Sequence, residues 1–184
     1  MEANLTLITG GSRSGKSAFA QQQAEQIDGP RLFIATCPRI DPEMDERIHR
    51  HQQDREGLGW QTAEVPLCLS EELERTPAGT TVLIDCLTLW INNLMYEAEQ
   101  KKQEISEDKI TVLAEDLARA ARKHQGRIFL VSNEVGLGIV PDNPQVRRYR
   151  DLVGRCNQLI AAFADQVFLV SCGLPMQLKE PDRL

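Results

Sequence analysis

The fold of this chain is decided near its N-terminus by Leu5-Thr6-Leu7-Ile8-Thr9-Gly10-Gly11-Ser12-Arg13-Ser14-Gly15-Lys16-Ser17. Residues 10–17 fit the pattern G-x-x-x-x-G-K-[ST], which is the signature of a phosphate-binding loop (P-loop). The apolar run 5–9 is typical of a buried strand, and residues 18–25 are typical of a helix. A chance match in a Gly/Ser turn is the alternative, and the flanking strand and helix argue against it. The segment therefore predicts binding of a nucleoside triphosphate.

Each part of this loop has a chemical reason. Glycines let successive backbone N–H groups point at phosphate oxygens, and the helix N-terminus adds a positive dipole end. The Lys16 ammonium can reach the β- and γ-phosphates, and the Ser17 hydroxyl can ligate Mg²⁺. We therefore predict a nucleotide site made of Gly10, Gly11, Ser12, Arg13, Ser14, Gly15, Lys16 and Ser17.

Composition narrows the class of protein. The 184 residues suffice for one domain with a full core, and we expect a single domain over 1–184. A net charge of −6 argues against nonspecific nucleic-acid binding. No apolar run approaches the ~20 residues of a membrane span, and the polar start does not resemble a signal peptide, so we expect a cytoplasmic protein. The five cysteines lack a C-x-x-C pair, which predicts reduced, mostly buried thiols and disfavours zinc.

Strand and helix patterns alternate along the chain, which predicts an α/β fold with a mainly parallel sheet and helices on both faces. One apolar stripe, Leu87, Trp90, Ile91 and Leu94, marks a helix face that we interpret as core or subunit interface rather than a ligand site. Further strands are expected at 31–35, 60–64, 80–85, 127–132 and 166–170, with a possible edge strand at 176–179. Helices are expected from Asp41 to about His51, from Ser70, from Leu87, from Ser106 to about Lys123, and from Asn143 past Leu159.

Polar side chains follow two of the predicted strands. Asp85 ends the strand at 80–85 and suits the acid that holds Mg²⁺ with a P-loop, although a strand-end carboxylate or a helix cap remains the alternative. Asn133 and Glu134 follow the strand at 127–132. Glu134 could accept a proton or orient water, or it could merely fix the turn at Gly136. In a parallel sheet the carboxyl ends of the strands line the ligand site, so these residues should lie near the P-loop.

The charged stretch 43–55 carries the remaining candidate. On a helix, Met44, Ile48, His51 and Arg55 share one face. An imidazole near arginines is disfavoured from protonating, so His51 would keep a free nitrogen as a nucleophile near neutrality. The pattern alone fits a histidine on the helix surface better, since most histidines carry no chemistry.

These residues together resemble a known family. The P-loop, Asp41 to His51, Trp60 to Glu64, Asp85-Cys86-Leu87-Thr88, Asn133 to Pro141 and Gly154 to Gln158 are similar to the bifunctional adenosylcobinamide kinase/adenosylcobinamide-phosphate guanylyltransferases of cobalamin biosynthesis. Asn-Glu-Val-Gly-x-Gly-Ile-Val-Pro and Arg-Ile-x-x-His are the most specific of these matches.

The resemblance implies a RecA-like P-loop sheet and a homotrimer. It implies phosphorylation of the aminopropanol hydroxyl of adenosylcobinamide by ATP or GTP, with Mg²⁺. Transfer of GMP from GTP to adenosylcobinamide phosphate would follow, through a guanylyl-histidine at His51, to give adenosylcobinamide-GDP and pyrophosphate. From the chemistry of the P-loop, we expect Lys16 to be the second catalytic residue. The resemblance also implies nucleotide contacts from Pro38, Arg39, Ile40, Gln52, Gln53, Asp54, Arg55 and Glu64. The chemistry of the P-loop adds Asp85 as a nucleotide contact, with Ser17 and Asp85 as metal ligands.

Two alternatives stay open on the sequence. A P-loop kinase for a small molecule would form no covalent nucleotide. A nucleotide-dependent regulatory ATPase would bind a partner rather than convert cobinamide, but it leaves the helix carrying His51 without a purpose.

Overall fold

A seven-stranded sheet organises the chain in the order β3-β2-β4-β5-β1-β6-β7. The structure is a computed structural model, and it describes residues 4–37, 55 and 57–180. All neighbouring strands are parallel except β6 and β7, which pair antiparallel at one edge. The strands are β1 (Leu5–Gly10), β2 (Arg31–Ala35), β3 (Trp60–Glu64), β4 (Thr81–Asp85), β5 (Ile128–Val131), β6 (Gln166–Ser171) and β7 (Leu174–Lys179). The predicted α/β fold and its antiparallel C-terminal edge strand are confirmed.

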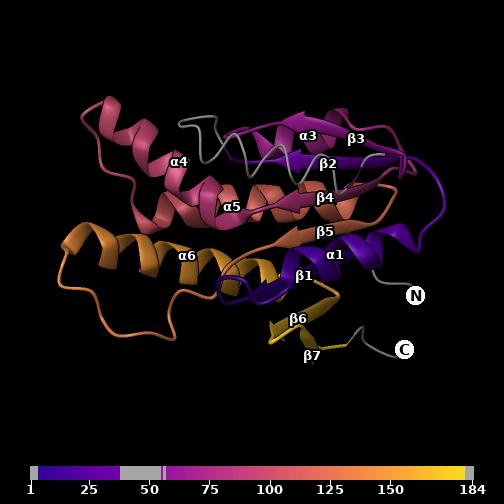
Figure 1. Cartoon of the computed structure of the whole chain (residues 1–184). Helices are drawn as coiled ribbons and strands as arrows, with labels where there is room; N and C mark the ends of the chain where they lie inside the picture. Colours follow the sequence, from indigo (N-terminus) through magenta and orange to yellow (C-terminus); the bar gives the residue numbers. More distant parts are fainter. Residues whose placement is uncertain (1–3, 38–54, 56, 181–184) are drawn as a thin grey trace.

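Helices cover both faces of the sheet (Figure 1). On one face α1 packs through Ala20 and Ala24 on a cluster that includes Ile8 and Val131. On the other face the remaining helices bury a larger cluster, which includes Leu87, Trp90 and Ile91 of the predicted stripe. The helices are α1 (Lys16–Glu25), α3 (Leu69–Arg75), α4 (Leu87–Gln100), α5 (Glu107–Lys123) and α6 (Pro144–Phe163).

Two predicted helix starts are confirmed by their caps. The Ser106 hydroxyl accepts a hydrogen bond from the Lys109 N–H, and the Asn143 side chain accepts from Gln145 and Val146. The cysteine prediction is half wrong. All five thiols are free as expected, but Cys86 and Cys156 alone are buried, while Cys68 and Cys172 are exposed. Both exposed thiols lie outside regular elements, Cys68 at the N-cap of α3 and Cys172 in the turn between β6 and β7, where apolar periodicity gives no signal.

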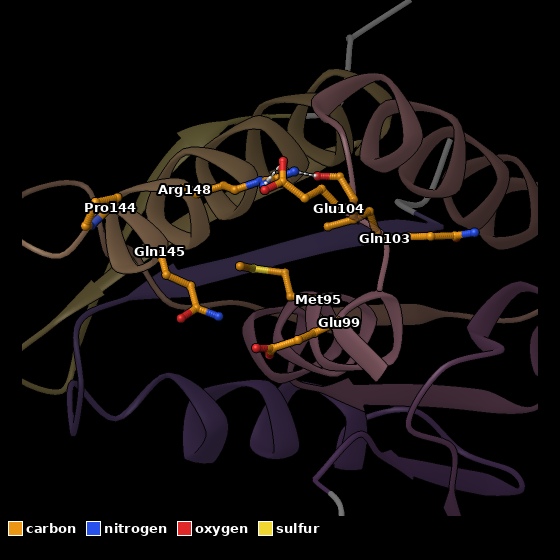
Figure 2. Close-up of a pocket in the computed structure, with 8 residues that line it drawn as sticks. Met95, Glu99, Gln103, Glu104, Pro144, Gln145 and Arg148 are labelled. Atoms are coloured by element: carbon orange, nitrogen blue, oxygen red, sulfur yellow. Dashed lines mark hydrogen bonds and ion pairs between the residues drawn. The ribbon is translucent and has the colours of Figure 1, made fainter. Parts of the chain in front are cut away.

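The N-terminal half of α6 and the whole of α4 extend beyond the carboxyl edge of the sheet and pack on each other (Figure 1). A groove of about 410 Å³ lies between the end of α4, the segment 103–105 and the start of α6 (Figure 2). Met95 and Gln145 line it from the two helices.

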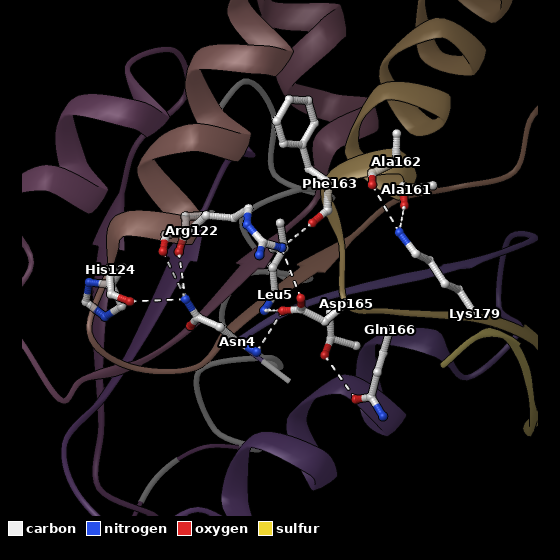
Figure 3. Close-up of polar contacts among 12 residues, drawn as sticks. Asn4, Leu5, Arg122, His124, Ala161, Ala162, Phe163, Asp165, Gln166 and Lys179 are labelled. Atoms are coloured by element: carbon white, nitrogen blue, oxygen red, sulfur yellow. Dashed lines mark hydrogen bonds and ion pairs between the residues drawn. The ribbon is translucent and has the colours of Figure 1, made fainter. Parts of the chain in front are cut away.

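At the amino ends of the strands β1 and β6, a carboxylate connects two segments of the chain. Asp165 accepts hydrogen bonds from the Asn4 and Leu5 N–H groups at 2.9 Å each and pairs with Arg122 at 3.0 Å (Figure 3). Burial alone would raise the pKa of Asp165, but these N–H groups and the guanidinium together lower it below its usual value. The start of β1 is thereby tied to the segment before β6.

Candidate active site

The P-loop curls between β1 and α1. Gly15 caps the helix with φ of 93°, a conformation that suits glycine, and a Cβ there would lie 3.2 Å from the Gly173 Cα. The Ser14 N–H donates to the Gly11 carbonyl at 3.3 Å, and the Lys16 ammonium donates to the same carbonyl at 3.1 Å. Lys16 therefore folds back over the loop that it follows, which is where a bound phosphate chain would meet it.

Neighbouring segments hold the loop in shape. The Glu134 N–H donates to the Gly10 carbonyl at 3.0 Å, and the Gly173 N–H donates to the Ser14 carbonyl at 2.8 Å. The Ser14 hydroxyl, by contrast, is buried and has no hydrogen-bond partner in the described chain. A buried hydroxyl without a partner costs about 1–3 kcal/mol, so this atom is suited to a ligand.

Asp85 ends β4 at the same edge of the sheet. Strand β5 lies between β1 and β4, and the register aligns Ile8, Val131 and Asp85 in one row. Two strand spacings of about 4.8 Å separate the outer members of that row, so Asp85 lies roughly 10 Å from β1 just below the P-loop. The sheet order therefore places Asp85 and the P-loop at the same carboxyl edge, as the sequence predicted.

A hydrogen-bonded clamp fixes the chain next to Asp85. The Thr36 hydroxyl accepts from the Cys86 N–H at 2.7 Å and donates to the Cys86 carbonyl at 2.8 Å. Asn93 of α4 donates to the Thr36 carbonyl at 2.8 Å. All three residues are buried, so the ends of β2 and β4 and the start of α4 behave as one unit.

The Cys86 thiol lies close enough to Asp85, the candidate metal ligand, and to Lys16 of the P-loop for their charges to affect its pKa. Burial first, and the Asp85 charge next, raise the pKa of Cys86 to about 11, against the opposing effects of a Thr88 hydrogen bond and the Lys16 charge. The thiol is therefore protonated at neutral pH, and Cys86 is no thiolate nucleophile. Its Sγ lies 2.8 Å from the Thr88 hydroxyl, which also accepts from the Asn133 amide at 3.3 Å.

The end of β5 is anchored to α6. The Ser132 hydroxyl donates to Asn157 Oδ1 at 2.6 Å, and Asn157 Nδ2 donates to the Asn133 carbonyl at 3.1 Å. Glu134 Oε1 accepts from the Gly136 N–H at 3.0 Å. This contact gives Glu134 the turn-fixing role that the sequence left open beside an acid–base role.

The other predicted nucleotide contacts are more scattered. Glu64 ends the edge strand β3 in the row of Ala35 and Asp85, so β2 separates it from Asp85. Arg55 is 5% exposed in a turn, and its guanidinium stacks 3.5 Å above the Phe33 ring. Phe33 lies two residues before the end of β2, so Arg55 packs on the face of the sheet. Seven predicted residues lie outside the described chain: Pro38, Arg39, Ile40, His51, Gln52, Gln53 and Asp54.

Sequence reasoning gave no role to the polar residues that brace this edge. Thr36 directly follows a predicted strand and Ser132 ends one, so their positions carried a signal of the same kind as Asp85. Asn93 and Asn157 lie within helices and reach the site through contacts 57 and 24 residues apart along the chain. Their roles depend on packing that a linear pattern does not contain.

The side chains suit a small hard cation. Ser17 is the second residue of α1 and Asp85 ends β4, and a hydroxyl and a carboxylate are oxygen ligands of the kind that Mg²⁺ takes. The described residues contain no group of three His, Cys, Asp or Glu side chains that could hold a metal. A metal bound here would therefore rely on nucleotide phosphates and water for its other ligands.

This sheet order, with a P-loop and an acid at one carboxyl edge, defines a P-loop nucleotide-binding enzyme. Residues 6–178 match the family described as cobinamide kinase / cobinamide phosphate guanyltransferase. The chain belongs to this family, which confirms the predicted kinase and nucleotidyltransferase of cobalamin biosynthesis. The family implies nucleotide and cobinamide substrates and, as for nucleotide-using kinases generally, a divalent metal.

Curated relatives cover almost the whole chain. It is 39% identical to the bifunctional adenosylcobalamin biosynthesis protein CobP of Pseudomonas aeruginosa, over 94% of this chain and 96% of that protein. It is 37% identical to the bifunctional adenosylcobalamin biosynthesis protein CobU of Salmonella typhimurium, over 95% and 99%. A solved structure from Pyrococcus horikoshii, titled as a structural study of PH0250, matches with a TM-score of 0.58 at 9% identity over 96% of this chain and 86% of that one, which shows a shared fold alone. No helix among the described residues is long and apolar enough to cross a membrane.

Proposed function

We propose that this chain, as one P-loop domain over 1–184, phosphorylates the aminopropanol hydroxyl of adenosylcobinamide with ATP or GTP. It then transfers GMP from GTP to that phosphate, which gives adenosylcobinamide-GDP and pyrophosphate. The observation that carries the proposal is the phosphate cradle at the carboxyl edge, with Lys16 folded over it and Asp85 two strands away. The full-length relationship to the bifunctional family supports both reactions.

In the kinase step, the alcohol oxygen attacks the γ-phosphorus and its proton passes to solvent. The bond from that phosphorus to the β-phosphate oxygen breaks, and the nucleoside diphosphate leaves with the electron pair. This reaction needs positioning and charge neutralisation more than covalent chemistry. Backbone N–H groups from Gly11 to Ser17 would hold the phosphates, and the Lys16 ammonium would neutralise charge on the γ-phosphoryl group as it moves. The clamp between Thr36 and Cys86 holds the chain next to Asp85 against the end of β2.

In the guanylyl step, neutral His51 attacks the α-phosphorus of GTP, an N–P bond forms, and pyrophosphate leaves with the electron pair of the broken P–O bond. The acceptor phosphate then displaces the imidazole. This role of His51 rests on the Arg-Ile-x-x-His run of the sequence. Nucleotide contacts from Arg55 and Glu64, and from the undescribed residues Pro38, Arg39, Ile40, Gln52, Gln53 and Asp54, are part of the same proposal.

We assign the metal as Mg²⁺, with Ser17 and Asp85 as its protein ligands. The donor chemistry supports this choice, because both groups are oxygen ligands and they lie at the edge where the phosphates would bind. Bound there, Mg²⁺ would offset negative charge on the phosphates.

We also propose a homotrimer. The segment after Glu134 supports contacts between copies, because Leu137 is 82% exposed and Ile139 is 95% exposed in one loop. Isolated exposed apolar side chains are common, but exposed apolar side chains that cluster together are typical of a contact surface.

Incubation with α-labelled GTP, followed by denaturation, tests the function. We expect acid-labile label on the wild type and on His49→Ala, and none on His51→Ala, because a phosphoramidate forms at one imidazole only. The His49 variant is the matched control from the same stretch. Label that persists in His51→Ala would refute the assignment of the nucleophile, and a wild type without label that still phosphorylates cobinamide would favour the kinase without a guanylyl step.

A further inference from the structure

Arg150 of α6 carries a buried hydrogen-bond donor without a partner. Its Nη1 is buried and has no hydrogen-bond acceptor in the described chain. Its Nε lies 4.0 Å from the Asp151 carboxylate, the limit of an ion pair. A guanidinium has five donors, and leaving a charged donor dry and unpaired is costly. The arrangement is suited to an anion that binds from outside the chain.

The neighbouring arginines on the same helix do have partners. Arg147 donates to the Pro141 and Asp142 carbonyls at 2.9 and 2.7 Å. Arg148 pairs with Glu104 at 2.6 Å and donates to the Ile105 carbonyl, as Figure 2 shows beside the groove. The groove therefore presents a guanidinium with a close carboxylate partner, whereas the carboxylate near Arg150, that of Asp151, lies 4.0 Å away.

Helix geometry places Arg150 on the side of the active site. Asn157 is seven residues further along α6, which is two turns, so both residues share one helix face about 10 Å apart along the axis. Asn157 holds the Asn133 carbonyl at the end of β5. The neighbouring Tyr149 hydroxyl donates to the Thr88 carbonyl at 3.2 Å, three residues after Asp85. Arg150 thus lies level with the start of α4, beyond the carboxyl edge of the sheet.

Two further unpartnered atoms lie at this edge. The Ser14 hydroxyl belongs to the P-loop, and Asn133 Oδ1 is buried beside Thr88 without a hydrogen-bond partner. A buried polar group without a hydrogen-bond partner calls for an explanation, and a bound polar ligand that supplies the missing hydrogen bond is one. The P-loop accounts for one anionic ligand, the nucleotide, and Arg150 lies on a different element, α6.

We propose that Arg150 binds the phosphate of the phosphorylated cobinamide during guanylyl transfer. The inference rests on the proposed function, in which this phosphate must approach the anionic guanylyl group. An oxygen of the acceptor phosphate forms a bond to the guanylyl phosphorus, the P–N bond breaks, and its electron pair returns to the imidazole. A guanidinium offsets the repulsion between the two phosphates and matches phosphate geometry with two parallel donors.

Separate measurement of the two half-reactions of Arg150→Gln tests this assignment. The first is the amount of enzyme-bound label formed from α-labelled GTP, and the second is the KM for adenosylcobinamide phosphate in formation of the GDP product. We expect the first to match the wild type and the KM to rise about 10- to 100-fold, the range for loss of one charge-assisted hydrogen bond. Arg150→Lys should recover part of the loss, since it restores charge without the planar fork.

Arg155→Gln is the matched control. Arg155 lies on the same helix but donates to Thr111 of α5 at 3.1 Å, away from the site, so its KM should stay at the wild-type value. An unchanged KM in Arg150→Gln, or equal losses in both half-reactions, would overturn the assignment, because the latter pattern indicates structural damage. A wild type that forms no labelled enzyme and no GDP product would instead refute the proposed guanylyl step.

Discussion

Replacement of Lys16 by methionine should lower the catalytic activity far more than the stability of the folded chain. In the folded chain the Lys16 ammonium makes one hydrogen bond, to the Gly11 carbonyl at 3.1 Å, and no carboxylate pairs with it among the described residues. One such bond contributes about 1 kcal/mol to the free energy of unfolding. For a chain of this size that corresponds to a fall in Tm of roughly 2–4 °C. The structural cost of the substitution is therefore small.

The catalytic cost should be far larger. An ammonium aimed at charge that develops during phosphoryl transfer contributes about 3–4 kcal/mol, or a factor of roughly 10²–10³ in kcat. Because both reactions use the same phosphate cradle, we expect Lys16→Met to lose the kinase and the guanylyl activities together. Turnover of adenosylcobinamide and of adenosylcobinamide phosphate, measured beside thermal melts, gives both quantities.

Lys179→Met is the matched control for this substitution. Its ammonium also donates to backbone carbonyls, those of Ala161 and Ala162 at 3.1 and 3.0 Å, but it lies at the far end of β7 (Figure 3). We expect a similar or larger fall in Tm and unchanged turnover. The reasoning fails if Lys16→Met keeps more than a tenth of either activity, or if its loss merely follows the fraction of unfolded protein.

Two further predictions concern stability and assembly. Asp165 has a lowered pKa in the folded state, so its stabilising effect is complete above the unfolded pKa of about 4 and disappears as the pH falls through the lower folded value. Urea melts should therefore show Asp165→Asn less stable than the wild type at pH 7, with the difference shrinking below pH 4, and a constant difference would contradict this account. Ile139→Glu should convert the proposed trimer to monomers in light scattering after size exclusion, because a carboxylate would replace a 95% exposed apolar side chain at the contact. A trimer that survives the change would remove this loop from the interface.

The fold was predictable wherever a local pattern determines it. Residues 5–17 combine an apolar run, two glycines with a conformational purpose and a helix start, so the strand, loop and helix follow from short-range chemistry. Ser106 and Asn143 predicted their helices for the same reason, since a cap acts within three residues. The position of Asp85 near the P-loop was predictable because the carboxyl ends of the strands lie together in any parallel sheet.

The rest of the candidate site depends on the order of the strands in the sheet. The insertion of β5 between β1 and β4 brings Asn133 between the P-loop and Asp85, and no local pattern contains that order. The hydrogen bonds of Thr36 with Cys86 span fifty residues of the chain. The unpartnered donor of Arg150 likewise exists only after α6 has packed. Long-range polar contacts are therefore where the structure adds most to the sequence.

The contact between Gly173 and Ser14 has a consequence for the order of synthesis. The turn that joins β6 to β7 donates one N–H to the P-loop, and it lies so close to Gly15 that a Cβ there would be 3.2 Å from the Gly173 Cα. The loop is encoded within the first seventeen residues, yet one of its supports is translated more than 150 residues later. A nascent chain still on the ribosome would carry the complete motif without its finished shape. We therefore expect the P-loop to reach its finished shape only after the hairpin of β6 and β7 has emerged.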